Sequence, residues 1–320
     1  MSDLPGVVVD TDGSYLSLSD ADFRDRIRSA YRRLSACDLC PRRCGADRLS
    51  GEVGACGAGI RPRVFVWNLH HGEEPPVSGT RGSGAVFFSG CNLRCSYCQN
   101  YPLSQLNHGT DMEVRSLASA FLELQRKGAH NINLVTPSHQ VPQVLASVYA
   151  ARQGGLHIPL VYNTSSYDEV SALKLLDGIV DVYLADLRYT DEQVGLRLSG
   201  VSDYVRNAKA ALVEMHSQVG DIKMDQSGRY IPHGIIVRYL ILPGYARMAR
   251  DVFSFVARQL SPETYVSVMT QYFAAYRALD PVLGINRKIN EAEFDEVMEE
   301  WSRSGLLHGW VQDMDEEGGA

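Results

Sequence analysis

The strongest constraint on the fold of this 320-residue chain is a regular alternation of short apolar runs and amphipathic helical stripes that begins at residue 85. The apolar runs occupy residues 85–89, 131–135, 158–162, 180–184, 234–242 and 265–269. Segments with helical spacing of apolar residues, such as 204–219 and 248–260, separate these runs. Strands that alternate with helices pair in parallel and carry their helices outside the sheet. The sequence therefore predicts an α/β fold, as a doubly wound sheet or a full or partial barrel.

The parts of the chain that flank this pattern differ from it in composition. Residues 1–60 contain an expected helix at 20–34 followed by a cysteine-rich segment that would bind metal. Residues 61–84 become rich in Gly, Pro and Ser, and we expect them to form a connecting loop. The barrel would span 85–290, and residues 291–320 would form a closing helix with an acidic tail.

The overall composition is that of a soluble globular protein, with 45% hydrophobic and 22% charged residues. The net charge of -7 argues against nonspecific binding to nucleic acid or to a membrane surface, because both usually need a basic surplus. No apolar run reaches the length of a membrane span, about 18 residues. The first residues also lack the features of a secretory signal. We therefore expect a cytoplasmic protein with no membrane or nucleic-acid partner.

Seven cysteines fall into two groups, and none is left over. The groups are Cys37, Cys40, Cys44 and Cys56, and then Cys91, Cys95 and Cys98. An odd number of cysteines in a reducing compartment speaks against a disulfide framework. Cysteines that served only as small core residues would also be more evenly scattered. The grouping predicts two sites that bind metal or catalyse a reaction.

The three-cysteine group lies directly after the apolar run at 85–89, in the segment SGCNLRCSYCQN with the spacing C-x3-C-x2-C. Three thiolates on one compact loop can bind three irons of a four-iron cluster, and no fourth cysteine lies nearby in the sequence. An iron without a protein ligand is open to a substrate, like the open position of a catalytic zinc site. The spacing predicts a catalytic 4Fe–4S cluster. A zinc site or a loop of unrelated cysteines is the alternative.

This segment resembles the C-x3-C-x-aromatic-C motif of the radical S-adenosylmethionine enzymes, with Tyr97 as the aromatic residue. The resemblance implies a partial (β/α)6 barrel in which Cys91, Cys95 and Cys98 are the catalytic cluster ligands and Tyr97 contributes to the cofactor site. It also implies that the open iron chelates the amino and carboxylate groups of S-adenosylmethionine. One electron would then break a sulfur–carbon bond and release a 5′-deoxyadenosyl radical that abstracts a hydrogen atom from the substrate.

A second stretch narrows the resemblance to one branch of these enzymes. Residues 237–244, VRYLILPG, are similar to a strand in the activators of glycyl-radical enzymes, such as pyruvate formate-lyase activating enzyme. The resemblance implies that Arg238 binds the cofactor carboxylate, which suits a guanidinium group; a structural arginine is the alternative. Asp186 begins a stretch that resembles the D-x-K element of these activators, with Arg188 in place of lysine. Asp186 would orient cofactor or substrate, or would only cap a helix.

The remaining cofactor contacts are expected from strand order. The Gly-Gly-Glu element that many relatives use for the amino group is absent, and Thr136 begins the sequence TPSH at the equivalent place. Backbone carbonyls at Thr136 would still accept hydrogen bonds from the cofactor. Asn163 and Ser165, after the third strand, would bind the ribose hydroxyls. Gln271, after the last strand, would cover the adenosyl group.

The four-cysteine group has the spacing C-x2-C-x3-C-x11-C, which completes either a tetrahedral zinc site or a second iron–sulfur cluster. A segment this short buries little apolar surface, so a metal is a natural way to hold it together. With the later stretches EEPPVSG and GAHNINLVTP, this group resembles the PflX group of pyruvate formate-lyase activating-like proteins. A second cluster would pass electrons to the first one or brace the protein.

Each of two charged regions is either a solvated part of the surface or a functional site. We expect His70, His71, Glu73 and Glu74 to lie in a solvated loop, and a lid over the cluster is the alternative. Arginines cluster at positions 24, 26, 28, 32, 33, 42 and 43. They form either a solvated helical face or a docking site for an acidic electron donor such as flavodoxin or ferredoxin.

The leading hypothesis is a radical S-adenosylmethionine enzyme that activates a glycyl-radical enzyme as its partner. Within the enzyme class, the alternative is a radical enzyme that acts on a small molecule or on another macromolecular residue. From a different class, the chain would be a noncatalytic iron–sulfur or zinc protein for electron transfer or assembly.

Overall fold

A computed structural model describes residues 7–311 of the chain, and a nine-stranded sheet forms its centre. The strands follow one another across the sheet in the order β11 (Gly309–Val311), β10 (Tyr265–Met269), β9 (Gly234–Leu240), β6 (Val182–Asp186), β5 (Leu160–Thr164), β4 (Ile132–Val135), β2 (Ser83–Phe88), β1 (Arg63–His70) and β3 (Thr110–Asp111). A separate two-stranded sheet is made of β7 (Lys223–Met224) and β8 (Tyr230–Ile231).

The six neighbouring strands from β10 to β2 are all parallel to one another. They coincide, within two residues at each end, with the six strands predicted from the sequence. Most of their residues are buried, as expected for parallel strands that are covered on both faces. The predicted α/β class with a mostly parallel sheet is confirmed.

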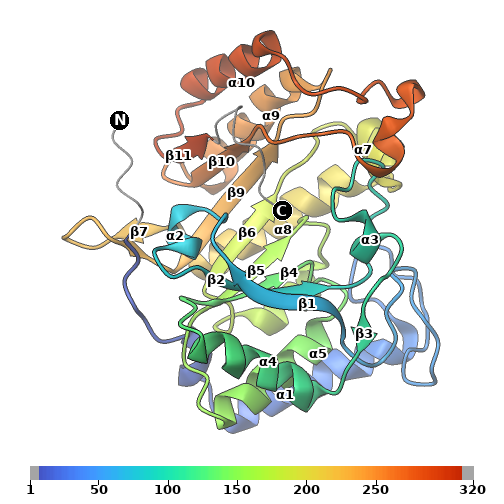
Figure 1. The fold of residues 1–320 in the computed structure, drawn as a ribbon, viewed down its shortest axis with the longest axis vertical. Coiled ribbons are helices and arrows are strands. Elements are labelled where there is room, and N and C mark those ends of the chain that lie inside the picture. The colour runs from blue at the N-terminus through green and yellow to red at the C-terminus, as the bar shows by residue number, and fades with distance from the viewer. Residues whose placement is uncertain (1–6, 312–320) are drawn as a thin grey trace.

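The helices surround this sheet and cover its faces. They are α1 (Asp20–Arg32), α2 (Pro75–Ser78), α3 (Tyr101–Ser104), α4 (Val114–Arg126), α5 (Val141–Gln153), α6 (Val170–Leu173), α7 (Glu192–Ser199), α8 (Tyr204–Val219), α9 (Ala249–Phe255) and α10 (Glu291–Ser304). Figure 1 shows α1, α4 and α5 packed together at the bottom of the view, and α9 and α10 together at the top, beside β10. The predicted helix at 248–260 is α9 continued by a π-helical turn.

The segment 61–84, which we expected to be a connecting loop, is largely structured. It contains β1 and α2, and β1 pairs antiparallel with both β2 and β3. Phe65 and Val66 of β1 are exposed, so this strand is held by backbone pairing with β2 more than by a buried apolar pattern of its own.

The C-terminal part also departs from the expectation. The predicted closing helix is confirmed as α10, but the chain then returns to the sheet as β11, which pairs with β10. The acidic tail predicted to follow lies at residues 312–320, outside the described part of the chain. Among residues 7–311, no helix is both long and apolar enough to cross a membrane.

The cysteine-rich segment docks on the loop that follows β2. The backbone N–H of Cys91 donates to the carbonyl oxygen of Cys56 at 3.1 Å. Gly90, between β2 and Cys91, has a left-handed φ of +78°, and a Cβ atom on it would lie 2.2 Å from the same carbonyl oxygen. Only glycine allows the two backbones to approach this closely.

We expect Gly90→Ala to lower the free energy of unfolding by about 2 kcal/mol or more, because it adds both a left-handed strain and a clash with backbone. Chemical denaturation of the anaerobic protein measures the change. Gly59→Ala is the matched control, since a Cβ atom there meets no atom within 4 Å. Equal stability of the two variants would contradict the close docking.

Candidate functional site

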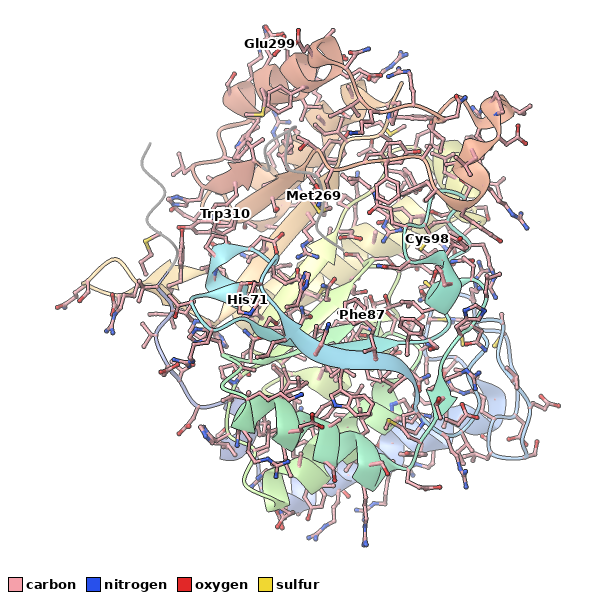
Figure 2. The ribbon with its side chains drawn as sticks, in the orientation of Figure 1. His71, Phe87, Cys98, Met269, Glu299 and Trp310 are labelled. Carbon is pink, nitrogen blue, oxygen red and sulfur yellow. The ribbon has the colours of Figure 1, made fainter. Side chains whose placement is uncertain are left out.

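The three-cysteine loop lies where the parallel strands end. Cys91 follows β2 by three residues, at the edge of the sheet where the carboxyl ends of the parallel strands lie. Cys91 and Cys95 are buried and Cys98 is half-buried, and the three side chains are near enough to influence one another's charge. In Figure 2, Cys98 lies well away from His71, which follows the other end of the β1–β2 ribbon. His71 is therefore not placed as a lid over these cysteines.

Each sulfur of the loop has a hydrogen-bond donor. The backbone N–H of Leu93 donates to Cys91 Sγ at 3.4 Å. The Ser199 hydroxyl lies 3.0 Å from Cys95 Sγ, and the Ser104 hydroxyl lies 3.0 Å from Cys98 Sγ. Hydrogen bonds of this kind stabilise metal-bound thiolates and tune the potential of a cluster.

Among the described residues, only Arg188 has a guanidinium that donates a hydrogen bond to a sulfur of this loop. Its Nη1 lies 3.0 Å from Cys95 Sγ, while its Nη2 lies 2.7 Å from the Asp186 carboxylate. Burial opposes the charge on Arg188, but Cys95 and Asp186 outweigh it and hold its pKa well above the ordinary value. The sequence singled out Arg188 only as a departure from a lysine, and the structure places it against the cluster loop.

Tyr97 is buried and takes part in a hydrogen-bond chain that leads back to Cys95. The Tyr189 hydroxyl donates to the Tyr97 hydroxyl at 2.5 Å and lies 2.9 Å from the Ser199 hydroxyl. Ser199 in turn contacts Cys95. Burial raises the pKa of Tyr97, so this phenol stays neutral and holds its place in the network.

The surroundings of the three sulfurs suit metal-bound thiolates better than free thiols. Burial raises the pKa of Cys91 to about 12, so an unligated thiol there stays protonated at neutral pH. Metal binding deprotonates such a thiol, and the donors around the sulfurs then stabilise the thiolates. Within residues 7–311, no group of three or more His, Cys, Asp and Glu side chains is arranged so that it could hold a metal ion. A cluster makes a different demand, because each thiolate binds a separate iron.

The predicted cofactor residues at the ends of β4 and β5 lie side by side. The backbone N–H of Thr136 donates to the carbonyl oxygen of Asn163 at 2.9 Å. Thr136 has a left-handed φ of 60°, and so has Ser166, directly after the predicted residue Ser165. The Ser165 carbonyl and the Asp186 carbonyl both accept from the Tyr204 hydroxyl, at 2.9 and 3.2 Å. Strain of this kind in residues other than glycine is enriched at ligand and active sites.

Arg238 has partners that the sequence did not suggest. It pairs with Asp186 in the register of β9 and β6. Its guanidinium forms ion pairs with Glu73 and with Glu74, the latter at 2.5 Å. Its Nη1 also lies 3.4 Å from Asn163 Oδ1.

The solvated-loop prediction is wrong for Glu73 and Glu74. Their side chains are only 8% and 3% exposed, because the segment before α2 folds over the face of the sheet where Arg238 lies. Burial raises the pKa of Glu74, but Arg238 outweighs it and keeps the carboxylate ionised. No local pattern indicated this burial, since it depends on a strand 164 residues away.

Two glutamines near the ends of the strands have unsatisfied side chains. Gln271 follows β10, and its carbonyl oxygen accepts from Gln99, one residue after Cys98, at 3.1 Å. Its side-chain oxygen is buried and has no hydrogen-bond partner among the described residues. Gln140, which the sequence reasoning missed, is fully buried, and neither of its amide atoms has such a partner there. Buried polar atoms without partners are candidates for contact with a ligand or an unseen water.

The four N-terminal cysteines also come together. Cys37, Cys40 and Cys56 are buried and Cys44 is exposed, and all seven cysteines of the chain are free. A Cβ atom on Gly54 would lie 3.3 Å from Cys56 Sγ and 3.6 Å from Cys44 Sγ. The structure thus brings together the cysteines that the spacing predicted as one group.

One stretch of the chain, which contains the three-cysteine loop, matches a known protein family. Residues 77–204 match a family described as a 4Fe-4S single cluster domain. These residues include β2, the three-cysteine loop and the strands β4 to β6. The predicted 4Fe–4S cluster is confirmed by this match.

Similar proteins were found over most of the chain. An uncharacterized protein of Methanocaldococcus jannaschii is 29% identical over 283 residues, which cover 86% of this chain and 76% of that protein. A solved structure of SuiB from Streptococcus suis, bound to S-adenosylmethionine, is 12% identical with a TM-score of 0.48, over 70% of this chain and 48% of that one.

Two further solved structures show a comparable likeness. A domain of pyruvate-formate lyase-activating enzyme from Bacteroides vulgatus has 11% identity and a TM-score of 0.37, over 51% of this chain and 85% of that one. A spore photoproduct lyase has 13% identity and a TM-score of 0.48, over 78% and 79% of the two chains. Residues 77–204 of this chain are thus similar to a 4Fe–4S single cluster domain, and they include Cys91, Cys95 and Cys98, whose spacing resembles the motif of the radical S-adenosylmethionine superfamily.

Proposed function

We propose that this chain reductively cleaves S-adenosylmethionine and uses the resulting 5′-deoxyadenosyl radical to abstract a hydrogen atom from a substrate. The bound cluster would supply one electron and an open iron for the amino and carboxylate groups of the cofactor. The protein's own part is to hold the cluster, orient the cofactor and exclude water.

The observation that carries this proposal is the separation of the cysteine side chains into two groups. The sulfurs of Cys91, Cys95 and Cys98 are one another's neighbours. Cys56 touches Cys91 through its backbone, but its sulfur lies near Cys37 and Cys44 instead. A four-iron cluster on the loop would therefore keep one iron free of protein ligands.

The residues at the carboxyl ends of the strands support cofactor binding. Thr136 and Ser166 hold strained backbone there, and Gln271 offers a buried amide oxygen without a partner among the described residues. Arg238 would reach the cofactor carboxylate only in competition with Glu73 and Glu74, which already pair with it. We therefore propose that Arg238 mainly braces this face of the sheet, and that Thr136, Ser165 and Gln271 make the closer contacts with the cofactor.

The finer part of the proposal concerns the substrate. The similarity of residues 237–244 to the activators of glycyl-radical enzymes favours a glycine of a partner protein as the site of hydrogen abstraction. An electron donor of the flavodoxin or ferredoxin class would reduce the cluster. A small molecule is the alternative substrate, and the same cleavage reaction would precede it.

We expect Cys95→Ala to abolish formation of 5′-deoxyadenosine, because the substitution removes one of the three cluster ligands. The assay uses anaerobically reconstituted protein, dithionite and S-adenosylmethionine, and detects the product by mass spectrometry. Val213→Ala, on an exposed face of α8, is the control that should retain the cleavage of the unsubstituted protein. If unsubstituted protein with a full, reduced cluster forms no 5′-deoxyadenosine, the proposal fails.

We expect Arg188→Met to shift the reduction potential of the loop cluster to a more negative value. Reduction adds negative charge to the cluster, and Arg188 stabilises that charge through its contact with Cys95. Redox titration followed by electron paramagnetic resonance measures the shift. Arg197→Met, at an exposed arginine of α7, should leave the potential unchanged. Identical potentials for Arg188→Met and the unsubstituted protein would show that Arg188 does not act on the cluster.

A further inference from the structure

We propose that Cys37, Cys40, Cys44 and Cys56 hold a second iron–sulfur cluster that passes single electrons to the cluster on the three-cysteine loop. The electron acceptor, which is the cluster on the three-cysteine loop, rests on the proposed function. The presence and identity of the second metal centre do not.

The four cysteines lie near one another and have hydrogen-bond donors suited to a cluster. Gly54 packs against two of the sulfurs: a Cβ atom there would be in tight contact with Cys56 Sγ, at 3.3 Å, and in ordinary contact with Cys44 Sγ, at 3.6 Å. Backbone amides also serve this group: that of Arg42 hydrogen-bonds the Cys40 side chain, and that of Ala58 hydrogen-bonds Cys56. Amide donors directed at cysteine sulfur are expected where the sulfur is a metal-bound thiolate.

Arg48 gives an independent indication of negative charge at this site. It is fully buried, yet none of the ion pairs found among residues 7–311 includes it. Its guanidinium donates to the carbonyl oxygens of Gly59 and His139, and its Nη1 lies 3.9 Å from Cys37 Sγ. A buried charge without a counter-ion is costly. Four metal-bound thiolates beside Arg48 would supply the missing negative charge.

The contact between the two cysteine groups supplies a path for the electron. It runs from Cys56 through its own backbone carbonyl and one 3.1 Å hydrogen bond to the backbone N–H of Cys91. Arg94 reinforces the contact by donating to the carbonyl of Ala55, and Arg42 does so by donating to the carbonyl of Asn92. One cysteine from each group is thus joined by covalent bonds and a single hydrogen bond.

The outer side of the four-cysteine group suits the entry of an electron. Cys44 is exposed, and the exposed Arg43, which forms an ion pair with Glu169, precedes it in a basic segment of an otherwise acidic protein. An acidic, reduced flavodoxin would dock here and lose one electron to the second cluster. That cluster would return to its oxidised state when it reduces the loop cluster, so each electron comes from the oxidation of one flavodoxin and the second cluster undergoes no net change.

The first experiment asks whether the site binds iron. The variant with Cys91→Ala, Cys95→Ala and Cys98→Ala, reconstituted anaerobically, should retain about four irons per chain and a paramagnetic signal on reduction. Adding Cys40→Ser to this variant should remove both the iron and the signal. Circular dichroism checks that the added substitution leaves the protein folded. Zinc in place of iron, or no bound metal, would overturn the inference even if the unsubstituted protein cleaves S-adenosylmethionine.

The second experiment asks whether the site conducts electrons. Cys44→Ser should slow the reduction of the loop cluster by reduced flavodoxin severalfold, while reduction by dithionite should proceed as before. Leu49→Ser, at an exposed residue of the same segment, is the matched control and should not slow either reaction. Unchanged reduction by flavodoxin in a variant that has lost the second cluster would overturn the relay. Electron paramagnetic resonance follows both reactions without any need for cofactor cleavage.

Discussion

The parallel pairing of six strands is the constraint on which the rest of this structure depends. It brings together residues that are far apart in the chain, because the carboxyl ends of parallel strands meet at one edge of the sheet. Cys91, Thr136, Ser165, Asp186 and Gln271 all follow or end such strands. None of these residues would be near another without the sheet, and the cluster loop would have no neighbours to complete its surroundings.

Three largely buried arginines differ in how their charge is compensated. Arg238 has two carboxylates from the segment before α2. Arg188 has one carboxylate and one cysteine sulfur. Arg48 has carbonyl oxygens and a more distant sulfur. In two of these cases, Arg188 and Arg48, the guanidinium lies against sulfur, which carries a negative charge only as a thiolate, the form that metal ligation requires.

The sequence was most informative where the signal is local. The six strands are short apolar runs bounded by helical stripes, and the C-x3-C-x2-C spacing is contained in eight residues, so both could be recognised without knowledge of tertiary contacts. The contact of Arg188 with Cys95 spans 93 positions, and that of Glu73 with Asn163 spans 90. Such contacts depend on strand order and on how one segment folds over a face, which no local pattern encodes. The strand β1 was missed for a different reason, since its run RVFVWNLH carries the β-branched and aromatic residues typical of strands but was included in the expected loop.

The segment before α2 affects the side from which molecules can reach the three-cysteine loop. Val77 packs with Val161, Val182 and Ile236 on the sheet, and Glu73 and Glu74 fill the next layer against Arg238. Side chains therefore close this face of the sheet toward the beginnings of the strands. We therefore expect molecules to reach the three-cysteine loop from the carboxyl ends of the strands, and not through the end of the sheet that Val77 covers.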